Sequence, residues 1–231
     1  MAYLPITLGI KDQASNANSY DESSKSEGLS AEVKQKILEK DNHTCRFCGF
    51  KAKKYQEIHY IDGNHQNLRT DNLATACIYC HQCFDLEKVA QMRSGMLIWL
   101  PEIDQGTLNH IARAIFVSRI SQGSMAETAT EALNILRERR QQAQSRIHTD
   151  DPFVLSIVMR DFLTSKHYNM RENKLEGIRL LPLDRRIIKE GDLEFNQFPQ
   201  ILAYWRSKAG PFGEKVPNQW KNFYASLAKT G

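Results

Sequence analysis

Apolar residues recur at intervals of three and four along most of the chain, which is the spacing of helices that bury one face. Helices are expected after Ser30, over 85–93, after Thr107, from Ser124 to Arg146 and over 153–163. Ser124 and Glu127 have the spacing of a capping box, which predicts the start of a long helix. Segment 153–163 follows Asp151 and Pro152 and is apolar nearly all round, so we expect a central core helix.

Shorter apolar runs, rich in β-branched and aromatic residues, predict strands. Strands are expected over 1–10, 50–55, 56–61, 96–100, 178–183 and 187–188. We expect 1–10 to pair with 96–100 or with another strand of the larger body. The helix after 56–61 is expected to begin close to Asn72 or at the second pair of cysteines. Residues 11–28 are polar and rich in serine, which predicts a flexible loop.

The composition, with 41% hydrophobic and 25% charged residues among 231, fits one or two folded domains. A net charge of +4 permits contact with nucleic acid but falls short of the basic surface of a dedicated DNA-binding protein. The first ten residues lack the basic leader of a signal peptide, and no apolar run is long enough to span a membrane. We therefore expect a cytoplasmic protein.

Four of the five cysteines form two Cys-x-x-Cys pairs, Cys45 with Cys48 and Cys77 with Cys80. Four thiolates in this arrangement are the ligands of a closed tetrahedral zinc site, which stabilises a small fold directly. An unligated reduced cluster and redox or other metal chemistry are the alternatives. The pattern predicts one structural Zn²⁺ in a reducing compartment, because no framework of disulfide-forming cysteines stands elsewhere.

The residues between and after the cysteine pairs form a second pattern. It consists of Glu57, His59, Ile61, Asn72, Leu73 and His81. Over about residues 42–84 this order resembles the HNH nuclease family, whose ββα-metal hairpin is often braced by four cysteines. The resemblance implies a predominantly helical α+β fold, with an HNH-like zinc module and a helical C-terminal part. It also implies that His59 and His81, with Asn72, stand where the family holds a catalytic metal beside the scissile phosphate.

Tyr60 departs from the family pattern, because the family has a second adjacent histidine at that position, its general base. Gly63 also replaces a familiar proline. A tyrosine hydroxyl, with an ordinary pKa near 10, is protonated at neutral pH and is a poor base. The resemblance therefore implies a degenerate site and no enzyme, since a metal without a base hydrolyses poorly. His65 is the alternative base, and an active atypical endonuclease or a non-cleaving nucleic-acid-binding module are the alternative functions.

Other polar residues near the motif have more than one interpretation. Cys83 is an alternate ligand, a partner-facing side chain or part of the buried face of the next helix. His43 is a ligand if one cysteine is diverted, or a solvated side chain at a helix end. Asp62 is an added metal carboxylate or a turn residue. The basic run 137–146 contacts phosphate or an acidic partner, or is a solvated helix terminus.

Two helices near the C-terminus are expected to have large aromatic residues on single faces, since these residues recur every three or four positions. Phe212 is expected to project from the turn between the two helices. Tryptophan and tyrosine are favoured anchors at protein interfaces. The candidate partner contacts are Trp205, Phe212, Trp220 and Tyr224. The alternative is that these side chains pack on one another and on the zinc module.

The degenerate nuclease motif, the helical extension and the aromatic helices together resemble subunits of the Dot/Icm type IVB secretion coupling complex. This resemblance implies a structural adaptor that is peripheral at the inner membrane and binds the C-terminal extension of the coupling ATPase DotL. It implies other coupling-complex subunits as further partners, an effector-recruiting platform, and no nucleic acid. The expected division is an N-terminal strand and loop (1–28), the zinc module (29–95) and a mainly helical part (96–231).

Overall fold

The computed structural model describes residues 3–11, 29–213 and 217–220, which form an α+β fold. The helices are α1 (Ala31–Lys40), α2 (Ile78–His81), α3 (Leu86–Met92), α4 (Gln105–Arg119), α5 (Ser124–Glu138), α6 (Arg140–Ile147), α7 (Pro152–Ile157), α8 (Ser165–Asn169), α9 (Arg171–Lys174) and α10 (Phe198–Arg206). Two 3₁₀ turns, η2 (Gln82–Phe84) and η4 (Pro217–Gln219), and a π-helical turn, η3 (Val158–Phe162), accompany them. None of the helices in these residues combines the length and apolar character that crossing a bilayer requires.

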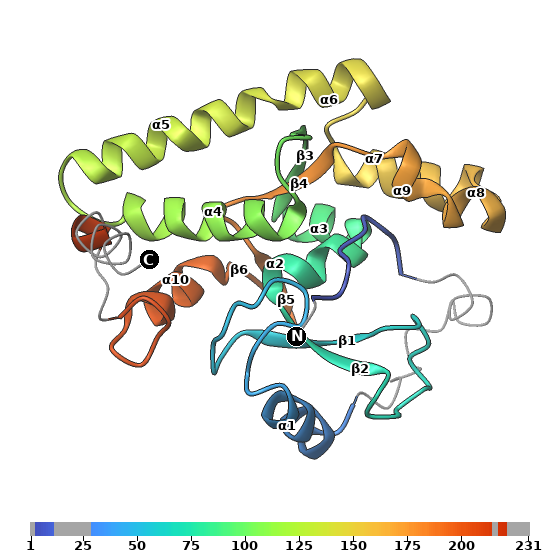
Figure 1. Cartoon of the computed structure of the whole chain (residues 1–231), viewed down its shortest axis with the longest axis horizontal. Coiled ribbons are helices and arrows are strands. Elements are labelled where there is room, and N and C mark those ends of the chain that lie inside the picture. Colours follow the sequence, from blue (N-terminus) through green and yellow to red (C-terminus); the bar gives the residue numbers. More distant parts are fainter. Residues whose placement is uncertain (1–2, 12–28, 214–216, 221–231) are drawn as a thin grey trace, which may run out of the picture.

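Within the described residues the strands form antiparallel pairs, each a separate two-stranded sheet. They are β1 (Gln56–Tyr60) with β2 (Leu73–Cys77), β3 (Gly95–Trp99) with β4 (Ile178–Pro182), and β5 (Ile187–Glu190) with β6 (Leu193–Asn196). In Figure 1, α4 runs through the middle of the molecule, with α5 and α6 along one side and α1, β1 and β2 on the other. Helix α4 packs against α2, α5, α10 and β4, so it joins the two sides.

Several predicted helices are confirmed, and the structure shows the N-cap residues at which they begin. Ser30 accepts a hydrogen bond from the backbone N–H of Val33 and begins α1. Helix α4 begins two residues before Thr107, because Asp104 caps it through the backbone N–H of Thr107. The predicted capping box of α5 is wrong. Gly123, with φ +84°, occupies the N-cap position, so Ser124 already lies inside the helix and its side chain does not cap it.

The strand predicted over 56–61 is confirmed as β1, but the strand predicted over 50–55 is wrong. That segment makes a single bridge, Thr44 with Lys51, and then turns at Tyr55, which has a positive φ. The partner of β1 is β2, after the loop 61–72, and His59 lies opposite Ala74. The following helix begins at the second cysteine pair, which was one of the two expected starts.

The predicted N-terminal strand is also wrong, since residues 3–11 form no strand and pair with none among the described residues. Their backbone groups make isolated hydrogen bonds to other segments. The Leu4 N–H donates to the Arg46 carbonyl, and the Gly9 N–H donates to the Cys83 carbonyl. The run 96–100 pairs with β4 instead. Most of the predicted flexible loop, 12–28, lies outside the described residues, as does Tyr224.

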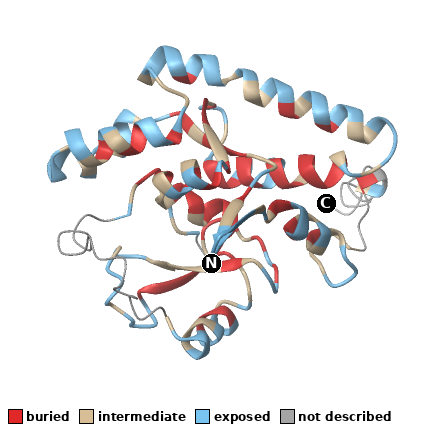
Figure 2. Cartoon of the chain, turned by 180° about the vertical axis from the view of Figure 1, so that it is seen from behind, coloured by how far each residue is buried: buried red, intermediate tan, exposed pale blue. Residues whose placement is uncertain are grey.

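The segment 153–163 is helical, but it is not a central core helix. Phe153 and Val154 are each 44% exposed, and Phe162 is 75% exposed. Helix α7 buries only one side, against α3 and β3, and η3 continues it at the edge of the molecule. Figure 2 shows exposed residues along this segment, whereas buried residues concentrate on α4 and around α2.

Candidate metal centre and the groove beside it

The four paired cysteines converge from two parts of the chain. Cys45 and Cys48 lie in the loop after α1, where the Cys45 N–H bonds the Phe50 carbonyl and the Gly49 N–H bonds the Cys45 carbonyl. Cys77 ends β2 and is also the N-cap of α2, which contains Cys80. The Cys80 backbone N–H donates to the Cys77 sulfur at 3.4 Å. The hairpin and the loop thus bring both pairs to one point.

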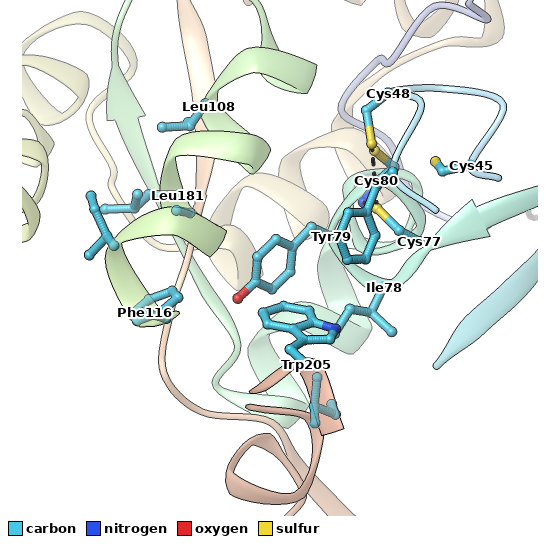
Figure 3. Close-up of a cluster of buried hydrophobic side chains, with 14 of the residues drawn as sticks. Cys45, Cys48, Cys77, Ile78, Tyr79, Cys80, Leu108, Phe116, Leu181 and Trp205 are labelled. Atoms are coloured by element: carbon cyan, nitrogen blue, oxygen red, sulfur yellow. Dashed lines mark hydrogen bonds between the residues drawn. The ribbon is translucent and has the colours of Figure 1, made fainter. Parts of the chain in front are cut away.

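The sulfur atoms of these four cysteines lie within 4.8 Å of one another, and all four residues are buried. The Cys48 and Cys77 sulfurs are 3.8 Å apart (Figure 3), far beyond disulfide bonding distance. Two thiolates at zinc-ligand distance from one ion, at the tetrahedral angle, would lie about 3.8 Å apart. The cluster therefore has the donors, spacing and burial to hold a metal ion.

A buried arginine from α4 adjoins the cluster. The Arg113 side chain is 0% exposed, and its Nη2 lies 2.6 Å from the Cys77 sulfur and 3.9 Å from the Cys48 sulfur. Its guanidinium carbon is 4.0 Å from the centre of the Phe50 ring and 5.0 Å from that of Tyr79. Although burial lowers the pKa of Arg113, the negative charges of Cys77, Cys48 and Cys80 raise it above its usual value. Arg113 thus supplies the positive charge beside this thiolate cluster.

Other polar residues of α4 also face the cysteines. Asn109 donates to the Cys80 sulfur at 3.3 Å, and Gln105 donates to the Asn109 side-chain oxygen at 3.0 Å. The His110 ring and the Cys48 carbonyl are 2.7 Å apart, within hydrogen-bond distance. The sequence pattern of the cysteines did not predict these residues. The available signal was the four-residue spacing of Gln105, Asn109 and Arg113, a polar line beside the apolar stripe of the same helix.

Cys83 and His43 lie outside the cluster. The Cys83 thiol is fully buried and donates to the Tyr79 carbonyl at 3.3 Å. It packs in a second apolar cluster with Leu86 and Val89, and burial raises its pKa well above the usual value. Cys83 is therefore a buried packing side chain.

Of the nuclease-like positions, His59, Tyr60 and His81 line a groove of about 510 Å³ between β1, α2 and the N-terminal segment, and Asn72 does not. The rings of His59 and His81 have centroids 6.0 Å apart, and Phe84 stacks on His59 at 4.1 Å. Burial, together with neighbouring positive charges, lowers the pKa of His59 to about 4 and that of His81 to about 3. Both imidazoles are accordingly neutral at pH 7.

Tyr60 and His65 meet at the mouth of this groove, with ring centroids 4.4 Å apart. Burial raises the pKa of Tyr60, so its hydroxyl stays protonated at neutral pH. Asn72 closes the loop 61–72: it accepts from the Asp62 N–H and donates to the Asn67 carbonyl, each at 2.9 Å. Asp62 accepts from Asn64 and Asn67 of that loop, which matches its interpretation as a turn residue.

The aromatic residues that were predicted to contact a partner differ in how far they are buried. Trp205 is 1% exposed and packs between Phe50 and Tyr79 in the main core, as Figure 3 shows for Tyr79, so its side chain is not available to a partner. Phe212 and Trp220 are half-buried on the same core, with ring centroids 6.2 Å apart. Contact of Phe212 or Trp220 with a partner stays a prediction.

No protein-family model matches the chain. The chain is similar to a protein of Legionella pneumophila subsp. pneumophila that is named type 4 apparatus protein DotN. The two are 34% identical over 160 residues, which make up 68% of this chain and 74% of the other.

Proposed function

The chain belongs to the family of the type 4 apparatus protein DotN, and from this premise we propose that it is a structural adaptor subunit of a type IVB secretion coupling complex. The observation that carries the proposal is the 34% sequence identity to DotN over 160 residues. In this role the chain binds the C-terminal extension of the coupling ATPase DotL, is peripheral at the inner membrane, and helps to assemble the platform that receives effectors.

We further propose that the cysteine cluster holds one structural Zn²⁺. Support comes from the four buried sulfurs within 4.8 Å, from the 3.8 Å separation of two of them, and from an arginine beside them. Zinc would supply no chemistry here beyond bonding, because all four tetrahedral positions are taken by protein ligands. The loop after α1, the end of β2 and α2 would be fixed to one another through it.

The unit of β1, β2 and α2 is, in this proposal, an HNH-like module that no longer cleaves DNA. The order of strand, strand and helix supports the resemblance to the HNH family, as does the placement of His59 on β1 and His81 on α2. Tyr60 stands at the position of the family's base, and its raised pKa leaves even less of its hydroxyl deprotonated at neutral pH than in free tyrosine. The module then serves as a rigid support.

A plasmid-nicking assay tests the absence of enzymatic activity. Wild type, His59→Ala and Tyr60→His are incubated with supercoiled plasmid and Mg²⁺ or Mn²⁺, after elemental analysis of their zinc. We expect no nicking by wild type and none by His59→Ala, with a gain of activity in Tyr60→His as the strongest support. Nicking by wild type that His59→Ala abolishes would replace the proposal with an active nuclease.

The outer face of α7 and η3 is the surface we propose for the contact with DotL. It consists of the exposed Phe153, Val154, Val158 and Phe162. Val154, Val158 and Phe162 recur at intervals of four, so they form one stripe along the helical segment, which is how an amphipathic helix of a partner is bound. Exposed large apolar residues in a cluster mark interaction sites more often than isolated ones do.

Binding of the purified DotL C-terminal extension, measured by titration calorimetry, tests this surface. Val158→Asp should weaken binding at least about tenfold, because a charge would be buried in an apolar contact. Ile135→Asp is the matched control, since Ile135 is 57% exposed on α5, away from this face. Equal affinity of Val158→Asp and wild type would exclude the face. Absence of binding by wild type would contradict the adaptor role itself.

A further inference from the structure

We infer that Arg113 is the counter-charge of the cysteine site and that it makes the docking of α4 depend on metal occupancy. The inference rests on the proposed metal centre. The candidate ligands all come from the loop after α1 and from the β2–α2 segment, whereas Arg113 belongs to α4. Arg113 therefore acts as a positioning residue for a site to which its own helix contributes no ligand.

Arg113 is buried without an ordinary ion-pair partner. In the part of the chain that the structure describes, no carboxylate lies within ion-pair distance of its guanidinium. Its Nε and Nη1 are buried and make no hydrogen bond there. A buried cation without a counter-charge is strongly destabilising, so the negative charge must come from the adjacent sulfurs.

A metal-loaded cysteine site holds that charge in place against Arg113. Four thiolates around one divalent cation retain a net negative charge, which the guanidinium at 2.6 Å from Cys77 partly offsets. Without the metal no bond holds the four sulfurs together at this spacing, so the negative charge beside Arg113 is no longer concentrated in one place. Arg113 is then a buried cation without a fixed counter-charge, and α4 is destabilised at that point.

The position of Arg113 in the fold extends this local effect. Arg113 lies in the part of α4 whose apolar residues, among them Leu108, Ala112 and Phe116, share the main core with the cysteines, and α4 packs against α2, α5, α10 and β4. The flanking rings of Phe50 and Tyr79 also contact Trp205 of α10. Loss of the metal is thereby transmitted to helices that contribute no ligand.

Zinc release and amide hydrogen exchange test the inference on the full chain. The variants are Arg113→Met, which removes the charge at similar length, and Arg113→Lys, which keeps the charge but loses the planar fork. Arg119→Met is the matched control, because Arg119 is on the same helix but pairs with Asp184 at 2.9 Å. Folding of each variant is checked by circular dichroism.

We expect a colorimetric chelator to extract zinc about 10- to 100-fold faster from Arg113→Met than from wild type, as for other residues that support metal ligands. Arg113→Lys should fall between them, and Arg119→Met should match wild type. After extraction, α4 amides should lose protection in wild type but keep most of it in Arg113→Met, which has no buried charge to expose. A residue with a merely structural role would not produce this reversal.

Equal extraction rates, or equal loss of α4 protection in wild type and Arg113→Met, would overturn the inference while the metal centre stands. If Arg113→Met does not fold, Arg113→Lys decides: release faster than in wild type supports the role, and release at the wild-type rate contradicts it. Wild type that contains no zinc on elemental analysis would overturn both the metal centre and the inference.

Discussion

His59 shows how burial sets the properties of a single side chain in this protein. Burial, with His81 and His65 nearby, lowers its pKa to about 4, whereas the unfolded chain has an ordinary value near 6.5. Between these values the unfolded chain binds more protons than the folded protein. The stability associated with neutral His59 is therefore complete above about pH 6.5 and is lost as the pH falls toward 4.

Replacing His59 by Gln should flatten part of the pH dependence of stability. Between pH 6.5 and 4, the free energy of unfolding of wild type should fall by at most about 1.4 kcal/mol more per pH unit than that of His59→Gln. Urea unfolding of both proteins at intervals across this range measures the difference. Above pH 7 the two curves should run parallel. Parallel curves at all pH values would contradict the burial of a neutral imidazole.

Two aromatic residues with opposite exposure give a second comparison. Trp205→Ala should lower the free energy of unfolding by about 3–5 kcal/mol, because a fully buried ring in contact with Phe50 and Tyr79 leaves a cavity. Phe162→Ala should change it by less than about 0.5 kcal/mol, since Phe162 is 75% exposed. Chemical denaturation of both variants checks this pair of values. A large loss in Phe162→Ala would mean that η3 is packed more tightly than its exposure indicates.

At the scale of elements, the sequence predicts what depends on local spacing. The cap at Ser30, the strand β1 and the start of α2 at the second cysteine pair follow from neighbouring residues. Convergence of the two cysteine pairs also follows from their spacing, because only a few ligand geometries suit a thiolate-bound metal.

The strand pairing and the helix burial that were predicted wrongly depend on contacts far along the chain. The pairing of β3 with β4 joins residues about 80 positions apart, and no local pattern indicates which strand β3 meets. The apolar character of 153–163 predicts burial, but the number of faces covered depends on how α3 and β3 pack there. Arg113 was missed for the same reason, since its neighbours Cys77 and Phe50 come from distant segments.

The cap of α4 offers a test at this scale. Asp104 accepts from the Thr107 backbone N–H at 2.7 Å and from its hydroxyl at 3.0 Å, and these bonds help to hold the pKa of Asp104 below its usual value. Asp104→Ala should destabilise the protein by about 1 kcal/mol, whereas Asp104→Asn should cost less because asparagine also caps. Thermal unfolding of the two variants distinguishes them. Equal losses would indicate that charge, and not capping, is what matters at this position.

At the scale of the whole molecule, α4 lies between the cysteine site and the remaining helices, so the metal should stabilise much more than the loop that binds it. Chelation of the proposed zinc should lower the midpoint of thermal unfolding by about 10 °C or more, because metal binding contributes directly to folding. Melting curves with and without chelator measure this. Cys77→Ser should melt like chelated wild type, while Cys83→Ala, a control at a buried cysteine outside the site, should remain sensitive to chelator.

The central claim is that this chain is a metal-held adaptor that binds the coupling ATPase. Native mass spectrometry of the chain, co-purified with the C-terminal extension of DotL, tests it most directly because one spectrum reports composition and metal together. The account predicts a one-to-one complex whose mass includes a single zinc ion. A complex without zinc would contradict the metal centre, and a zinc-loaded chain that never binds the extension would contradict the adaptor function.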